Sequence, residues 1–180
     1  PVERLILREG SLRRQMVALE TSDASVPVLR WDEDPLPPPL EAQILKQADR
    51  DAFELPPRGA REGWATEWHH SMAPWMKEAW AAMNDGMLLV VDYALESSRY
   101  YAPHRADGTL MAYRRQQASS DVLRDAGCQD ITAHLCLESL VGAAEEAGWS
   151  CAGHCRQGEA LLALGLAERL TALQQMPGDQ

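Results

Sequence analysis

The sequence contains no apolar run long enough to cross a membrane. Its apolar stretches, such as residues 87–91, fall far below the roughly 20 residues that a spanning helix needs. A surplus of basic residues is also missing, because 27 acidic residues against 17 basic ones give a formal net charge of −10. A field of that sign repels other polyanions. We therefore expect neither nucleic acid nor a membrane among the partners of this chain.

We also expect no secretion signal. The chain starts at Pro1 without an initiator methionine, a basic segment or the apolar segment that such signals carry. These features predict a cytoplasmic protein and a chain cut from a longer one. Hydrophobic residues make up 46% of the sequence, which is enough to build a core.

The spacing of the cysteines suits zinc poorly. The four cysteines, Cys128, Cys136, Cys151 and Cys155, all lie in the last third of the chain. Structural zinc sites usually use ligand pairs roughly two to four residues apart, and only the last two cysteines meet that spacing. The sequence therefore favours reduced cysteines in or near the core over a metal site.

The N-terminal third predicts strands followed by a short helix. Residues 3–7 and 12–19 form an expected hairpin, and residues 26–31 form a further strand. Four prolines predict that residues 32–39 are a loop. Helical spacing of apolar residues after Leu40 then predicts a short helix.

A stripe of large apolar residues runs from residue 64 to residue 84. Its three-or-four-residue period indicates one face of an amphipathic helix, within which Pro74 must start, end or kink a segment. Four tryptophans belong to the stripe. They suit either a ligand-stacking surface or plain core packing, and we interpret them as core packing.

Residues 86–93 predict the central strand of a parallel sheet. Five consecutive apolar residues follow a glycine and are closed by Asp92, a composition typical of a strand buried on both faces. Ligands bind at the carboxyl ends of such strands. The remaining expected elements are a strand at 109–114, a short helix at 119–125, an extended segment at 130–136, a helix at 137–147, a strand at 149–155 and a helix at 158–173.

Six short strings occur in an informative order. They are Pro1-Val2, Trp64-Ala-Thr-Glu-Trp, Gly86 to Ala94, Gly108-Thr-Leu with Tyr113-Arg114, Gly127 to Leu137, and Arg156-Gln157 through Gly165. In this order they resemble segments of the MidA-like S-adenosylmethionine-dependent methyltransferases, a family that includes assembly factors of mitochondrial respiratory complex I. The chain departs from the family's pattern at Ala94, Cys136, Leu137 and Arg156.

The resemblance implies a fold class. It is α/β, the C-terminal half of a Rossmann-like class I methyltransferase fold with an inserted β-hairpin and helical substrate region. Residues 1–63 would form the insert, with its hairpin, proline-rich loop and short helix. Residues 64–180 would supply the C-terminal helices and strands of the methyltransferase sheet.

The resemblance also implies S-adenosylmethionine as cofactor. In the family, the glycine-rich turn and the acidic residue that binds the ribose belong upstream of Pro1. Gly142, Gly148 and Gly153 form no Gly-x-Gly-x-x-Gly between a strand and a helix, so the chain lacks a backbone cradle. We expect the cofactor to bind a longer protein and not this chain alone.

Methyl transfer requires that the protein align a nucleophile with the methyl group and remove its proton. A protein side chain is the expected acceptor. If it is arginine, as the family's link to protein arginine methylation suggests, Glu67 and Asp130 would grip the guanidinium through charge-assisted hydrogen bonds. The expected catalytic residues are Asp130 and His134, and the expected substrate-binding residues are Glu67, Asp92, Tyr93 and Thr132.

Each assignment has an alternative. Asp130, Thr132 and His134 alternate along an extended segment and so face one side together. Thr132 and His134 would equally serve to satisfy backbone groups of a loop, and Asp92 would equally cap the following turn.

Two other functions stay open. The chain would also suit a non-catalytic protein-interaction module of an assembly factor, binding through its tryptophan-rich helix and acidic loop. A nicotinamide-dependent oxidoreductase would need its own upstream glycine loop, and no string supports it. An exposed sheet edge would favour pairing with a second copy, so a homodimer is compatible with the sequence.

The cysteine spacing generates a first prediction. Because it fits no closed tetrahedral set, elemental analysis of the purified protein should find well under one zinc ion per chain. A stoichiometric zinc content would overturn this interpretation.

Overall fold

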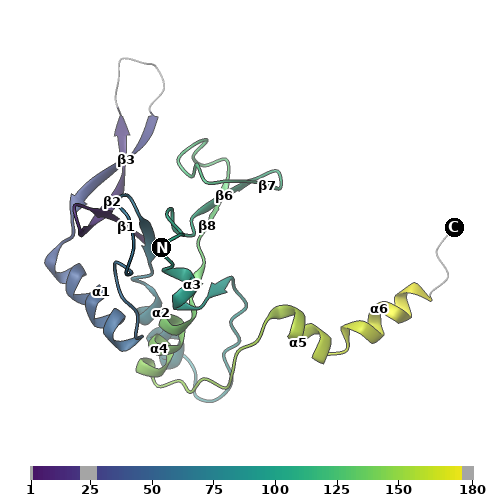
Figure 1. Cartoon of the computed structure of the whole chain (residues 1–180). Helices are drawn as coiled ribbons and strands as arrows, with labels where there is room; N and C mark the ends of the chain where they lie inside the picture. Colours follow the sequence, from purple (N-terminus) through teal and green to yellow (C-terminus); the bar gives the residue numbers. More distant parts are fainter. Residues whose placement is uncertain (1, 21–27, 176–180) are drawn as a thin grey trace.

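The computed structural model describes residues 2–20 and 28–175. These residues form a mixed α/β structure with sheets of four, three and two strands (Figure 1). The predicted α/β class is thus confirmed. The Rossmann-like half fold stays a prediction, since only one strand pair among the described residues is parallel.

The largest sheet is antiparallel, with strand order β3-β2-β1-β4. The predicted hairpin is confirmed, and its turn has positive φ at Glu9 and Gly10. The two central pairings, of β1 with β2 and with β4, bury Leu5, Ile6 and Leu7 of β1 and all four residues of β4. The bounds are Glu3–Arg8 for β1, Ser11–Glu20 for β2, Val28–Pro35 for β3 and Ala65–Trp68 for β4.

The predicted loop at 32–39 is wrong at both ends. β3 continues to Pro35, and helix α1 begins at Pro38 and runs to Arg50 (Pro38–Arg50). Proline is tolerated in an edge strand. It is also tolerated in the first turn of a helix, because the N–H groups there have no hydrogen-bond partner within the helix. Residues 26 and 27 of the third predicted strand lie outside the described residues.

The apolar stripe divides into a strand and a helix. Trp64 and Trp68 are buried at β4, whereas only Met72–Ala81 is helical (α2), with Pro74 in its first turn. A single helix from residue 64 was therefore a wrong prediction, because hydrogen bonds to β1 override the helical spacing. Core packing holds for the first two tryptophans, but Trp75 and Trp80 are about half exposed, at 48% and 46%.

The prediction of a buried central strand at 86–93 is contradicted. These residues belong to no strand, and Met87, Leu89 and Val91 are 79%, 80% and 71% exposed. Leu88 alone of the run packs inward, against the cluster that contains Met76. Among the described residues, no strand pairs with this segment. Strand pairing begins only after it, at the short strand β5 (Ala94–Leu95), which lies parallel to β9 (Leu135–Cys136).

The C-terminal half agrees in part with the sequence. Strand β6 (Met111–Arg114), strand β8 (Asp130–Thr132) and helix α4 (Leu137–Ala147), which ends at Gly148, are confirmed. The expected helix at 119–125 is wrong, because β7 (Gln117–Ser119) pairs with β6 and turns follow. The expected strand at 149–155 is also wrong, since these residues have no strand partner. A short helix, α3 (Ser97–Tyr100), was not predicted.

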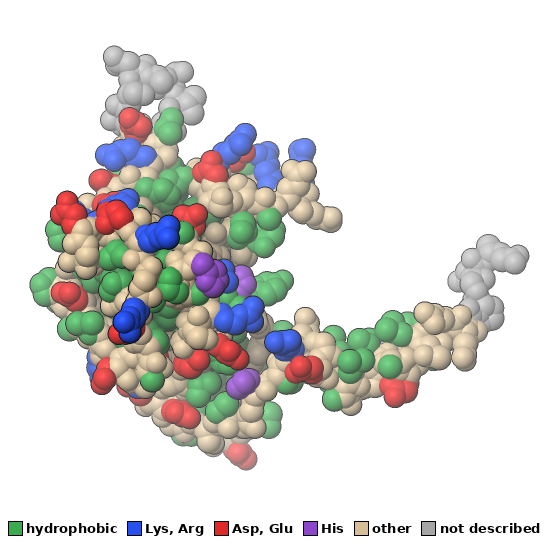
Figure 2. Space-filling model, viewed as in Figure 1, with side chains coloured by type: hydrophobic (Ala, Val, Ile, Leu, Met, Phe, Trp, Pro, Cys, Tyr) green, Lys and Arg blue, Asp and Glu red, His purple; other side chains and the backbone are tan. Residues whose placement is uncertain are grey.

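The last predicted helix is two helices. Gly165 adopts a left-handed φ of 86° between α5 (Gln157–Ala163) and α6 (Leu166–Gln174). Figure 1 shows both helices extending away from the body as an arm, and Figure 2 shows hydrophobic side chains along it. Neither helix has a buried residue.

Three clusters of buried apolar side chains form the core. One packs β1 against α3, a second packs the sheet against α1, and the third joins α2 to α4. Trp64 and Trp68 belong to the first and the second cluster, so the β4 segment connects them. The buried members are Leu7, Trp64, Tyr100, Tyr101 and Cys136, then Leu5, Ile44 and Trp68, then Met72, Met76 and Ala143.

The cysteines are less buried than expected. Cys136 lies in the core, and burial raises the pKa of its thiol, but Cys128, Cys151 and Cys155 are exposed. Within residues 2–20 and 28–175, no three His, Cys, Asp or Glu side chains are grouped so as to hold a metal ion. No helix in this part of the chain is both long and apolar enough to span a membrane.

Candidate functional site

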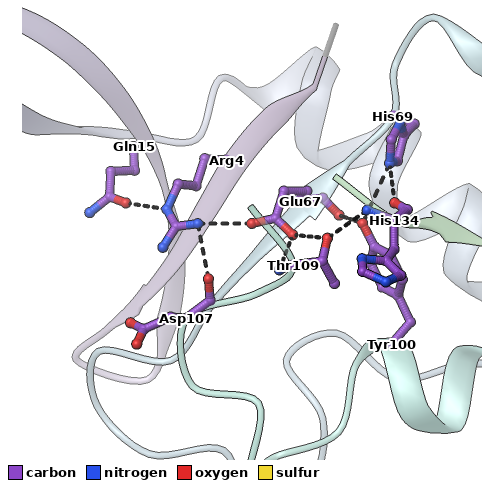
Figure 3. A network of polar contacts seen from close by, with 8 residues as sticks. All are labelled: Arg4, Gln15, Glu67, His69, Tyr100, Asp107, Thr109 and His134. Carbon is purple, nitrogen blue, oxygen red and sulfur yellow. Dashed lines mark hydrogen bonds and ion pairs between the residues drawn. The ribbon is translucent and has the colours of Figure 1, made fainter. Parts of the chain in front are cut away.

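A fully buried carboxylate lies at the centre of the polar network in Figure 3. Glu67 stands on β4 opposite Arg4 of β1, and its Oε1 accepts a hydrogen bond from Arg4 Nη1 at 2.8 Å. Its Oε2 accepts from the backbone N–H of Thr109 at 2.6 Å and from the Thr109 hydroxyl at 2.8 Å. A buried carboxylate needs such compensation, because the removal of an unpaired charge from water costs roughly several kcal/mol.

The cationic partner is itself held from several sides. The Nε of Arg4 donates to Gln15 Oε1 at 2.7 Å, and its Nη1 also donates to the carbonyl of Asp107 at 3.1 Å. The guanidinium lies 5.3 Å from the ring centre of Trp31. Strands β1, β2 and β3 therefore all contribute to the placing of one charge beside Glu67.

The position of the Glu67 carboxylate requires a glycine at position 108. Gly108 has a left-handed φ of 69°, and a Cβ there would collide with the Glu67 side chain, 2.7 Å from Oε2. The turn can approach Glu67 only without a side chain. The Gly-Thr-Leu string of the sequence thus has a structural reason.

His134 is anchored through its backbone. Its N–H donates to the Thr109 hydroxyl oxygen at 3.0 Å, and its carbonyl accepts from His69 Nε2 at 2.8 Å. Because a carbonyl oxygen only accepts, His69 Nε2 must carry the proton. Burial lowers the pKa of His69, which keeps this imidazole uncharged near neutral pH.

The imidazole of His134 lies where residues 86–93 end. Its ring centre is 5.8 Å from that of Tyr93, and the next residue, Leu135, donates its N–H to the Tyr93 carbonyl at 2.8 Å. Burial, followed by the positive charge of Arg105, lowers the pKa of His134. Its Nδ1 is buried and without a hydrogen-bond partner.

The other predicted residues lie nearer the surface. Asp92 and Tyr93 are exposed, and Asp92 Oδ1 accepts from the Tyr93 N–H at 2.7 Å. Asp130 is exposed on β8 in register with Tyr113 of β6, and Thr132 is half-buried two residues on. Asp130 also lines an open cleft of about 430 Å³ with Arg114, Arg115 and Cys128.

The structure therefore joins some predicted residues and separates others. Glu67 and His134 are linked through Thr109, and Tyr93 contacts His134. The burial of Glu67 argues against direct contact with a substrate, and its place in the network points to an indirect role.

Sequence reasoning missed Arg4, His69 and Tyr100. Arg4 pairs with Glu67 only because β1 and β4 lie side by side, which nothing in the sequence signalled. Burial and the nearby Glu67 raise the pKa of Tyr100, whose hydroxyl donates to the Glu67 carbonyl at 3.4 Å. Thr109 had a signal, since it stands in one of the six strings, but it was not singled out.

The contact between Gly108 and Glu67 generates a second prediction. Gly108→Ala should lower the free energy of unfolding by about 3 kcal/mol, through left-handed strain and displacement of the buried carboxylate. Gly59→Ala is the matched control, because Gly59 has φ 88° but open space around it, and it should cost about 1 kcal/mol. Urea unfolding would measure both, and equal losses would contradict the close approach.

Residues 1–155 match the protein family described as "Putative S-adenosyl-L-methionine-dependent methyltransferase". None of the curated proteins matches the sequence. A crystal structure of a COG1565 superfamily member and "likely methyl transferase" from Burkholderia thailandensis, bound to S-adenosyl-homocysteine, is similar to the chain with a TM-score of 0.79 and 28% identity. The similarity covers 96% of this chain and 41% of that protein.

A second solved structure gives the same result. It is the native structure of an uncharacterised COG1565 superfamily protein from Burkholderia thailandensis, with a TM-score of 0.78 and 28% identity over 96% of this chain and 42% of that one. The chain thus spans about two fifths of the length of these proteins. Since the family match takes in residues 1–155 of 180, the chain belongs to the S-adenosylmethionine-dependent methyltransferase family.

Proposed function

We propose that this chain works within an S-adenosylmethionine-dependent methyltransferase whose acceptor is a protein side chain, with arginine the first candidate. The methyltransferase part of the proposal is carried by the solved relative with S-adenosyl-homocysteine bound, which this chain resembles over 96% of its length. The protein side chain as acceptor rests on the resemblance of the short sequence strings. S-adenosyl-homocysteine is what remains of the cofactor after its methyl group has been transferred. A finer placement, among the MidA-like enzymes and complex I assembly factors, rests on strings such as residues 127–137.

The described residues do not by themselves fit the cofactor. Such a ligand is normally held by backbone N–H groups at a glycine-rich turn before a helix and by a carboxylate on the ribose. In the described part of the chain, no helix that follows a strand is preceded by such a turn. Because the chain spans about two fifths of its solved relatives, we propose that residues beyond these 180 complete the cofactor site.

The exposed face of residues 86–93 is where we propose that the rest of the enzyme packs. Met87, Leu89 and Val91 expose most of their surface, which is unfavourable for an isolated chain in water. Strand β5, which directly follows residues 86–93, already has a parallel neighbour in β9. Packing against the remaining part of the enzyme would remove these side chains from water.

The proposed proton acceptor is His134. Its lowered pKa leaves the imidazole uncharged near neutral pH, so it can take the proton that the acceptor nitrogen loses. Asp130 would hold a cationic acceptor by charge and hydrogen bonding. Asp92, Tyr93 and Thr132 are proposed to line the same substrate path.

A protein-interaction module is the second candidate. Trp75 and Trp80 are about half exposed on α2, and the arm of α5 and α6 exposes Leu162, Leu164 and Leu173. Exposed apolar side chains of this kind suit a partner surface, either another protein or a second copy of this chain. If methyl transfer were unaffected by substitution of Asp130 and His134, that result would favour the interaction module over catalysis by these two residues.

Asp130 provides the test of the site. In a chain extended by its flanking sequence so that it binds the cofactor, Asp130→Ala should lower methyl transfer by roughly a hundredfold, because the acceptor loses its anchor. The control is Asp121→Ala, another exposed carboxylate of the same region, which should leave the rate unchanged. A large drop in melting temperature with Asp130→Ala would show that this residue is structural.

Cofactor binding provides a separate test. Calorimetry of the 180-residue chain with S-adenosylmethionine should detect no binding tighter than roughly millimolar, because one wall of a pocket buries too little of the ligand. The extended chain should bind it. A micromolar dissociation constant for the 180-residue chain would mean that the cofactor site lies within it.

A further inference from the structure

We propose that Glu67, Thr109 and His69 are positioning residues that hold His134 in place for its role as proton acceptor. The catalytic part of this inference rests on the proposed function. The geometric part does not, because it concerns contacts inside this chain. None of the three residues needs to touch a substrate.

The direction of the hydrogen bonds carries the argument. Glu67 is a buried carboxylate beside Arg4, so its oxygens only accept, and the single hydrogen of the Thr109 hydroxyl must point to it. The Thr109 oxygen is then left to accept the N–H of His134 at 3.0 Å. The ion pair thereby fixes which way the hydroxyl turns.

A second anchor comes from the opposite side of the same peptide. His69, just after β4, donates Nε2–H to the His134 carbonyl at 2.8 Å. Both backbone groups of His134 are therefore held by side chains, and both anchors originate next to β4. His134 lies between the end of β8 and the start of β9. Hydrogen bonds of a sheet therefore do not hold its backbone in place.

His134 lies at the place where we propose that the proton is accepted. Its ring faces Tyr93 at the carboxyl end of residues 86–93, and the charged groups that act on it are Arg105, Glu67 and Asp92. A proton acceptor must stay within roughly 2.6–3.2 Å of the atom that it serves, so loss of an anchor would reduce the rate of proton transfer. Figure 3 shows the network from Arg4 to His134.

The proposal predicts what happens when the threonine hydroxyl is removed. Thr109→Val keeps the shape of the side chain but deletes the acceptor for the His134 N–H, so the imidazole should become more mobile and better hydrated. Since burial is the main cause of its lowered pKa, the pKa of His134 should rise toward the ordinary value of about 6.5. Thr109→Ser keeps the hydroxyl and should retain the wild-type pKa.

The measurement is an NMR titration of the His134 imidazole in the 180-residue chain, with amide-signal dispersion as the check that each variant is folded. If Thr109→Val does not fold, His69→Phe and His69→Gln take its place, since glutamine keeps an N–H donor and phenylalanine does not. The pKa should rise with phenylalanine and not with glutamine. An unchanged pKa in the folded variant that lacks the anchor would overturn the proposal.

This titration needs neither cofactor nor methyl acceptor. A failure of methyl transfer in the extended chain would therefore overturn the proposed function while leaving the titration result intact. In an active extended chain, Thr109→Val should lower kcat by about tenfold with little change in KM, and Thr109→Ser should restore it. A loss confined to KM would contradict a positioning role.

Discussion

The structure depends on one buried ion pair, that of Arg4 with Glu67. A carboxylate that is completely removed from water is stable only with full compensation, and here it has a guanidinium and two donors of Thr109. These donors come from a turn more than 40 residues further along the chain. The pair therefore joins the antiparallel sheet to the turn of Thr109, whose hydroxyl accepts the N–H of His134, and Gly108 lets this turn approach Glu67 closely.

Two kinds of surface meet at the end of this network. On one side, Glu67 and Thr109 are buried, His69 is half-buried, and all three are hydrogen-bonded. On the other, residues 86–93 present apolar side chains to solvent. His134 lies between them, with its backbone in the network and its ring beside Tyr93. The backbone of His134 is thus fixed at the edge of an exposed apolar segment.

The site residues predicted from sequence differ in how they relate to this arrangement. Asp130 and Asp92 are exposed carboxylates and so are free to meet a ligand, whereas Glu67 is enclosed. Predicting Glu67 as a substrate ligand followed from its charge and its place in a string. Its charge is used inside the protein instead, because Arg4 lies opposite in the register of β1 and β4.

What the sequence by itself determined was local. Chain segments whose structure depends on near neighbours were predicted well, such as the hairpin of residues 3–7 and 12–19 and the helix Leu137–Ala147. The order of the strings predicted an S-adenosylmethionine-dependent methyltransferase, which the family match confirms. Only the tertiary structure decided whether Trp64 to Trp68 would be strand or helix, and whether residues 86–93 would be covered. Both outcomes depend on which strands lie alongside, and a periodic pattern carries no record of a partner that is distant in the chain.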